Sequence, residues 1–279
     1  MTQNTTILDT LAKYIENQSD FPVLNPDAAR LQNEIIKPDP DLDAVKKLIR
    51  TDPTLTSKIL KVANSPYYRG LGEVSTIKEA ALRMGQAELF NMIMQVIHKQ
   101  NFRSKNPMIK GLQTRLWDHC VACAFASLWL TRHLKMDDLV SKAFIAGLLH
   151  DMGKLCLLSA LEKVLASKEE TIKLTPDLVG DILTNRHETQ GYALLTQWKL
   201  PVQYCNIARD HHIENYDESD SLLLVVRLAD MICKKMDPKN QEYDMTYIMG
   251  SREADILGIK ETGIALLEIA MEDASVVQV

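Results

Sequence analysis

The sequence has little of what marks several large classes of protein. Among its 279 residues the net charge is -5, and without an excess of Lys and Arg we expect no nucleic acid partner, because binding to phosphate backbones depends on clustered basic residues. No apolar run approaches the roughly 20 residues that cross a bilayer, and the N-terminus "MTQNTTILDT" lacks the charged and apolar regions of a secretion signal. We therefore expect a cytoplasmic protein without a membrane partner.

Cysteine is scarce and odd in number. The five cysteines lie mostly in apolar segments with helical spacing, which does not indicate a disulfide framework. The pair at positions 120 and 123 is a single C-x-x-C without a second pair, so it predicts neither a zinc site nor redox chemistry. We expect all five to be reduced and buried: Cys120, Cys123, Cys156, Cys205 and Cys233.

Sustained alternation of apolar and polar residues, the pattern of β-strands, is absent. Nearly every segment instead repeats apolar residues at helical spacing, and with 46% hydrophobic and 25% charged residues the composition is that of a globular protein. This predicts an all-α fold. The polar stretch "HKQNFRSKNPMIKG" is the best boundary. We expect an N-terminal helical half at residues 1–105, a helical bundle with the functional site at 106–240 and a C-terminal helical extension at 241–279.

The stretch "AGLLHDMGKL", residues 146–155, places His150 and Asp151 side by side in a segment otherwise suited to burial. Burying an imidazole and a carboxylate is costly unless the two groups pair with each other, form a hydrogen bond in the core or bind a metal. The segment reads as one helix, in which Lys154 lies on the same side as both residues and can neutralise a substrate phosphate. Gly153 would let another backbone or a ligand approach closely.

The second half of the chain also contains most of the histidines. Imidazole and carboxylate ligands suit Mn, Fe, Zn or Ni rather than calcium, and a helical bundle can direct them into one space. The alternative is that each is a hydrogen-bonded core residue, but this must explain every position separately. We favour one metal centre with these ligands: His119, His150, Asp151, His187, His211, His212 and Asp230.

Several motifs together resemble those of HDOD-domain proteins, a branch of the HD metal-dependent phosphohydrolase superfamily found in bacterial signal transduction. They are "FPVLNPDAARLQNEI", "LIRTDPTLTSKILKVANSPYYRG", "VSTIKEAALRMG", "LWDHC", "AGLLHDMGKL", "HETQGYALLTQWKLP" and "HH". The resemblance covers roughly residues 20 to 235. It implies a fold in which an N-terminal helical region packs on an HD-type helical bundle.

The resemblance also assigns roles to the metal ligands. It matches His119, His150, Asp151 and Asp230 to the general HD ligands, and His187, His211 and His212 to the histidines of a second metal position. Asp151 would then bridge two divalent ions, whose identity (Mn, Fe, Ni, Zn or Mg) stays open.

Differences from the motifs of related enzymes narrow the range of expected substrates. The region after the paired histidines reads "HHIENYDESD" instead of the Gly-Tyr-Pro motif of the HD-GYP phosphodiesterases, which disfavours hydrolysis of cyclic di-GMP. Arg115 stands where some of those relatives have a Glu, which disfavours a third metal. Gly153 and Lys154 stand where hydrolases of guanosine tetraphosphate have an acidic pair, which disfavours that activity as well.

Two functions follow from these observations. The first is metal-dependent hydrolysis of a phosphorylated small molecule or nucleotide in bacterial signalling, with Asp151 and Lys154 as catalytic residues that act beside two ions. The alternative is a non-catalytic signalling module that binds a partner protein, with a vestigial or structural metal site. The first hundred or so residues, which contain no catalytic constellation, favour the alternative.

Overall fold

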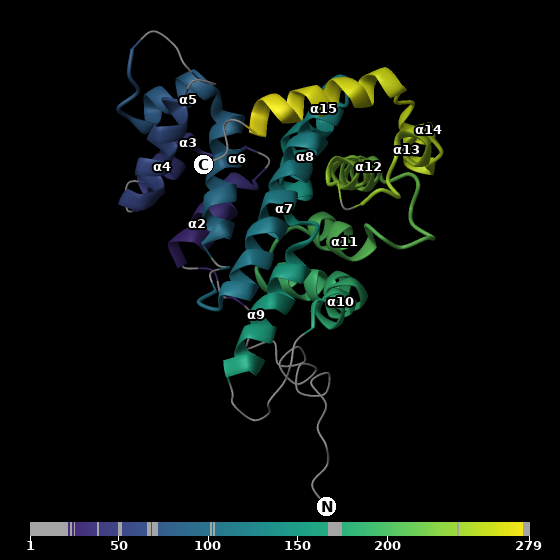
Figure 1. Ribbon diagram of the computed structural model, residues 1–279. Helices are drawn as coiled ribbons and strands as arrows, with labels where there is room; N and C mark the ends of the chain where they lie inside the picture. The colour runs from purple at the N-terminus through teal and green to yellow at the C-terminus, as the bar shows by residue number, and fades with distance from the viewer. Residues whose placement is uncertain are drawn as a thin grey trace, which may run out of the picture. The chain divides into compact units, whose positions relative to one another are not determined.

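The computed structural model describes residues 22, 24, 26–37, 39–49, 52–65, 68, 72–100, 102, 104–166, 175–238 and 240–275. The N-terminal segment "MTQNTTILDT" lies outside them. Across the described ranges the regular elements are helices and no strand occurs, which confirms the predicted all-α class (Figure 1). All five cysteines are free and buried, as predicted.

The chain divides into two compact units. One contains Met1–Val23 and Phe102–Glu261, and the other contains Leu24–Asn101 and Thr262–Val279. The change of unit between Asn101 and Phe102 falls close to the predicted boundary at residue 105, whereas the predicted three-part organisation as a whole stays a prediction.

The smaller unit is built from short helices. Local sequence sets several of their ends: Asp52 accepts hydrogen bonds from the first backbone N–H groups of one helix, and Thr76 forms a capping box with Glu79 at the next. Gly85, at φ 88°, separates two consecutive helices in a conformation that favours glycine. These helices are α2 (Pro26–Ile35), α3 (Leu42–Ile49), α4 (Pro53–Ala63), α5 (Ile77–Met84), α6 (Gln86–Lys99) and most of α15 (Glu261–Ser275).

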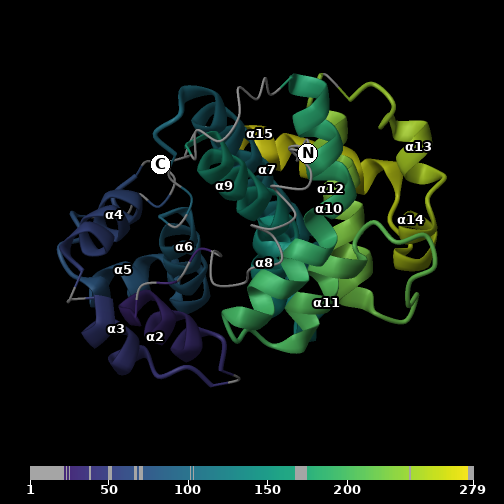
Figure 2. The same ribbon diagram turned by 90° about the horizontal axis from the view of Figure 1, so that it is seen from below.

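The larger unit is a bundle around one long helix, α7, which packs against α8, α9 and α12 (Figure 2). Helix α10 packs against α9 and α11, and α11 also contacts α8 and α12. The helices are α7 (Pro107–His133), α8 (Asp137–Leu149), α9 (Met152–Ala166), α10 (Pro176–Gln197), α11 (Val202–Asp210), α12 (Ser221–Met236), α13 (Met245–Met249) and α14 (Arg252–Leu257).

The prediction of a single helix across "AGLLHDMGKL" is wrong, because α8 ends at Leu149 and α9 begins at Met152. His150 and Asp151 form the turn between them. The combined stretch Asp137–Ala166 is, contrary to our expectation, long and apolar enough by length and composition to cross a membrane, but 83% of its apolar window is buried inside the protein. It has the character of core helices in a globular unit.

Two glycines beside this turn allow the helices to approach closely. A Cβ on Gly147 would lie 2.6 Å from the carbonyl oxygen of Cys123, and a Cβ on Gly153 would overlap the backbone of His187 and Gly191. The prediction that Gly153 admits another backbone is therefore confirmed. The turn at His150 and Asp151 is held between α7 on one side and α10 on the other.

Candidate metal centre

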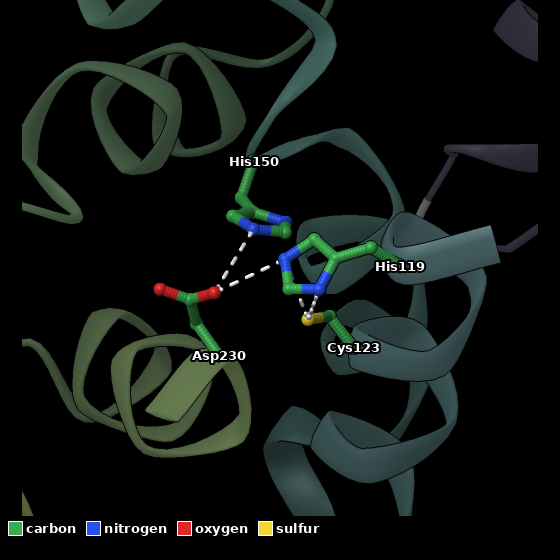
Figure 3. A group of neighbouring side chains, drawn as sticks. All are labelled: His119, Cys123, His150 and Asp230. Carbon is green, nitrogen blue, oxygen red and sulfur yellow. Dashed lines mark hydrogen bonds and ion pairs between the residues drawn. The ribbon is translucent and has the colours of Figure 1, made fainter. Parts of the chain in front are cut away.

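The structure brings all seven predicted ligands together in the larger unit, in two adjoining groups. In each group the candidate ligand atoms lie within 4.8 Å of one another. We call the first the cysteine group, which consists of His119, Cys123, His150 and Asp230 (Figure 3). We call the second the histidine group, which consists of Asp151, His187, His211 and His212.

The cysteine group is assembled from three parts of the bundle. His119 and Cys123 are four residues apart on α7, so both side chains lie on the same face of that helix. His150 comes from the turn between α8 and α9, and Asp230 comes from α12. In Figure 3 these side chains point toward one another, and dashed lines join His119 to both Cys123 and Asp230.

The histidine group is assembled from the neighbouring helices. His187 lies on α10, and His211 and His212 directly follow α11. The Nε2 atoms of His187 and His211 are 3.3 Å apart. His212 is the most open member, with 30% of its side chain exposed, whereas the side chains of His187 and His211 are at most 2% exposed.

Asp151 lies between the two groups and directs one carboxylate oxygen toward each. Its Oδ2 lies 3.7 Å from His119 Nε2 and 3.6 Å from His150 Nε2. Its Oδ1 lies 3.6 Å from His187 Nε2 and 3.4 Å from His211 Nε2. A carboxylate placed in this way has the arrangement needed to bridge two cations.

Three histidines are held by their Nδ1 atoms. The Nδ1 atom of His150 lies 2.7 Å from Gly147 O, that of His187 lies 2.8 Å from Leu183 O, and that of His211 lies 3.1 Å from Ile207 O. A carbonyl oxygen can only accept, so we assign the proton of each ring to Nδ1. The lone pair of each Nε2 then faces the centre, as in a histidine that binds a metal.

Three atoms that face the centre are fully buried and have no hydrogen-bond partner in the structure: His150 Nε2, Asp151 Oδ1 and Asp230 Oδ1. His119 Nε2 lies 3.1 Å from Asp230 Oδ1, within ion-pair distance. Such atoms cost free energy when they are left unpaired, and each is of a type that can bind a metal in its deprotonated form. The residues present therefore fit bound cations.

Burial keeps several of these imidazoles neutral. Removal from water lowers the pKa of His150 to about 3, of His187 to about 4 and of His212 to about 2, and it outweighs the nearby carboxylates, which raise these pKa values. A metal binds the neutral imidazole, so these side chains are in their ligand form at neutral pH.

His119 differs from the other histidines. Burial lowers its pKa, but Cys123 and Asp230 outweigh burial and hold the pKa well above its usual value. Burial also raises the pKa of both aspartates, yet it is outweighed by Lys154 and His150 at Asp151, and by His119 and Lys234 at Asp230, so both pKa values lie well below the usual range. Both carboxylates are therefore ionised at neutral pH.

Each aspartate has its own lysine. Lys154 Nζ lies 2.7 Å from Asp151 Oδ2, on the same side as that residue, as its spacing predicted. Lys234 Nζ lies 2.7 Å from Asp230 Oδ2. Lys234 was not predicted, although its position four residues after Asp230 on α12 is the kind of spacing that singled out Lys154. Both ammonium groups leave the second oxygen of the carboxylate directed toward the centre.

Arg227 is another residue that the sequence did not indicate. Its Nη1 donates to the carbonyl oxygens of His211 at 2.8 Å, Ile213 at 3.1 Å and Asp210 at 3.3 Å, and its Nε is paired with Glu253 on α14. The guanidinium thus fixes the backbone that follows α11. It positions His211 and His212 without touching their rings.

A family model and a curated relative both match most of the chain. The HDOD domain model matches residues 21–214. An uncharacterized protein from Treponema pallidum (strain Nichols) is 27% identical over 242 residues, which is 85% of this chain and 46% of that protein, so the chain spans about half the length of this curated relative.

Solved structures show the same fold at low identity. An HDOD domain protein of unknown function from Geobacter sulfurreducens superposes with a TM-score of 0.70 at 19% identity, covering 96% of this chain and 94% of that one. A proposed metal-dependent phosphohydrolase from Shewanella amazonensis SB2B gives a TM-score of 0.66 at 19% identity, covering 96% and 99%. With more than half of its length matched by the family model, the chain belongs to the HDOD domain family.

Proposed function

We propose that the protein is a metal-dependent phosphohydrolase that holds one divalent ion at the cysteine group and one at the histidine group. The observation that carries this proposal is the position of Asp151, whose two oxygens face different groups of histidines. A structural hydrogen bond would need only one of these oxygens. Two adjacent cations and a carboxylate between them form the kind of site that hydrolyses phosphate esters in many enzymes.

The charges of the site favour an anionic substrate once ions are bound. Without ions the carboxylates of Asp151 and Asp230 are balanced by the ammonium groups of Lys154 and Lys234. Divalent ions would supply Lewis-acid polarisation of a phosphoryl group and activation of water. They would also leave an excess of positive charge, which complements the charge of a phosphate ester.

The residues of the chain have separate tasks in this proposal. Lys154 keeps Asp151 ionised through the contact of 2.7 Å and would offer positive charge to a phosphoryl oxygen in the transition state. His119 and His212 are the partly exposed members of the centre, at 21% and 30%. A substrate would therefore reach the ions from the side of these two rings, and the buried ligands would hold the ions from behind.

The finer parts of the proposal concern the substrate and the setting. We infer a phosphorylated small molecule or nucleotide as substrate, because the positive charge is confined to one small centre. A role in bacterial signal transduction and a cytoplasmic location belong to the same proposal. A structural neighbour from Marinobacter aquaeolei VT8 that is described as a signal transduction protein, with a TM-score of 0.68 at 16% identity, shares the fold.

A second candidate function is a non-catalytic signalling module that binds a partner protein. The observation that favours it is that Asp151 and Asp230 are each already paired with a lysine at 2.7 Å, so the charges balance without a metal. In that case the two lysines would serve only to neutralise the buried carboxylates at the start of α9 and within α12.

Metal content and hydrolysis together distinguish the two candidates. Protein purified without chelator is analysed for bound metal and assayed with phosphomonoesters, phosphodiesters and cyclic dinucleotides in the presence of Mn, Fe, Ni, Zn or Mg. We expect about two equivalents of metal and metal-dependent hydrolysis, both lost in His150→Ala. The matched control is His133→Ala, which removes an exposed histidine at the end of α7. A wild-type protein that binds no metal would refute the proposal that the protein is a metal-dependent phosphohydrolase.

A further inference from the structure

Cys123 lies inside the candidate metal centre, although the family resemblance assigns it no role. Its Sγ is 3.5 Å from His119 Nε2 and 3.9 Å from His119 Nδ1 (Figure 3). The residue is fully buried, and it shares one face of α7 with His119. Two side chains four residues apart on a helix can bind one ion together, as the paired histidines of H-E-x-x-H sites do.

A second observation marks the same place as a site for a cation. His150 Nε2 and Asp230 Oδ1 point into the cysteine group, are fully buried and have no hydrogen-bond partner in the structure. Together with the sulfur of Cys123 and a ring nitrogen of His119 they offer four donor atoms within 4.8 Å of one another. Four donors at such separations correspond to the usual coordination number of zinc in proteins, and Asp151 Oδ2, which faces the same group, would be a fifth.

From these contacts we propose that Cys123 is a ligand of the metal in the cysteine group and that its thiolate makes this position selective for zinc or another thiolate-binding ion. The inference rests on the proposed function only in taking metal to bind here. The thiol proton passes to solvent when the metal binds, because only the thiolate is a ligand.

The two metal positions then differ in chemistry. The histidine group offers three imidazoles and the carboxylate of Asp151 but no sulfur. Soft thiolate ligands select zinc and iron, whereas oxygen-rich positions suit magnesium, calcium and manganese, and imidazole suits several transition metals. The cysteine group would therefore retain a zinc-type ion, while the histidine group accepts a wider range. The two positions would then hold ions of different metals.

Cobalt provides a direct readout of the thiolate. Full-length wild-type protein is stripped with chelator and titrated with Co²⁺, and we expect thiolate-to-cobalt charge-transfer absorption in the near ultraviolet. Cys123→Ser should lose this absorption while still binding cobalt through the histidine group. In competition between Zn²⁺ and Mn²⁺, its zinc affinity should fall at least about tenfold, since loss of residues that merely orient a metal ligand already costs about 10- to 100-fold.

Two other cysteines supply matched controls. Cys120 is buried one position after His119 on α7, and Cys233 on α12 hydrogen-bonds with Cys123. We expect Cys120→Ser and Cys233→Ser to keep the charge-transfer absorption. Absorption that disappears in one of these variants and persists in Cys123→Ser would overturn the assignment, as would a wild-type protein that binds cobalt without the absorption or that binds no cobalt.

A measurement on the wild-type protein keeps the proposal testable if Cys123→Ser does not fold. X-ray absorption at the zinc edge, with one equivalent of Zn²⁺ bound, should show a sulfur neighbour at about 2.3 Å besides nitrogen and oxygen neighbours at about 2.0–2.2 Å. Only nitrogen and oxygen neighbours would refute the role of Cys123. Hydrolysis is not used as a readout, so a protein with the sulfur neighbour but no phosphohydrolase activity contradicts the proposed function and leaves this inference standing.

Discussion

The cysteine group and the histidine group contain the same number of candidate ligands but are held in different ways. In the histidine group, His187 and His211 are oriented by backbone carbonyls of their own helices, and Arg227 fixes the backbone after α11. In the cysteine group, His119 is instead close to Cys123 and Asp230, which are themselves candidate ligands.

The difference teaches how each group would respond to a metal. The histidine group is organised by atoms that a metal does not use, so its imidazoles are set before the metal arrives. In the cysteine group His150 is also held by a backbone carbonyl, that of Gly147, but His119 is held by contacts with Cys123 and Asp230, which a metal must replace. Asp151 couples the two groups because it contributes an oxygen to each.

The largest effect is expected from Asp151→Asn, which removes the charge shared by both groups. The variant should retain at most one of two metal equivalents. Hydrolysis should slow about 10³-fold or more, because each loss of about 1.4 kcal/mol of transition-state stabilisation slows the reaction tenfold and metal assistance contributes several kcal/mol. Metal analysis and kcat/KM for a phosphate ester measure both. Asp138→Asn, at an exposed position in the first turn of α8, is the control. If the Asp151 variant keeps two ions, the coupling is wrong.

The next largest effect is expected from substitutions that disturb the packing of the helices beside one group at a time. Gly147→Ala would push α8 from α7 near Cys123, and Gly153→Ala would push α9 from α10 at His187. We expect each to lower the free energy of unfolding by about 1–3 kcal/mol or more, as overpacking does. Gly147→Ala should weaken metal binding mainly at the cysteine group, and Gly153→Ala mainly at the histidine group. Chemical denaturation and cobalt titration measure the two quantities.

Gly180 on α10 provides the control for the glycine variants. A Cβ there meets no atom within 4 Å, so Gly180→Ala should stabilise the helix by up to about 1 kcal/mol and leave metal binding unchanged. Equal loss of both metal positions in Gly147→Ala and Gly153→Ala would contradict the separate anchoring of the two groups.

Local sequence predicted the helices well and their interruption badly. Apolar residues continue at helical spacing through His150 and Asp151, and His150 itself keeps a right-handed helical conformation at φ -56° and ψ -38°. No glycine or proline marks the break at that point. The turn depends on how closely α7 and α10 approach on either side, which is a property of tertiary packing that spacing along the chain does not contain.

The candidate site was predictable where polar residues stand in apolar surroundings. This signal identified the histidines and aspartates, and the structure brings them together. It missed Cys123, because a cysteine in an apolar helix reads as a core residue, although its spacing from His119 was available. It missed Arg227 entirely, because that side chain acts on backbone carbonyls of residues that are distant in the sequence.

A smaller effect is expected when the support of one group alone is removed. Arg227→Met keeps much of the side-chain volume but loses the hydrogen bonds to the backbone of His211 and Ile213. Metal affinity at the histidine group should fall about 10- to 100-fold, as for other residues that orient a ligand, with the cysteine group unchanged. Calorimetric titration measures the two affinities. Arg252→Met, which breaks only the exposed pair with Glu218, should change neither.

The smallest effect concerns the dependence of stability on pH, which has opposite signs at His187 and at His119. His187 has a folded pKa of about 4, below its unfolded value of about 6.5, so stability is lost as pH falls from about 6.5 toward 4, by roughly 0.7 kcal/mol between pH 7 and 6. His119 has a raised pKa, so its contribution is complete below about pH 6.5 and is lost as pH rises through the folded value. Chemical denaturation of metal-free protein from pH 5 to 9 measures both limbs.

Substitutions of His187 and His119 test their contributions to the two limbs of this profile. His187→Gln should remove part of the loss on the acid side, and His119→Gln should remove the loss on the alkaline side, because each deletes the proton that is bound differently in the folded and unfolded states. His133→Gln, at an exposed position outside both groups, should leave the profile as in the wild type. If His119→Gln instead changes the acid limb, then His119 is neutral in the metal-free protein, and the cysteine group is organised like the histidine group before metal binds.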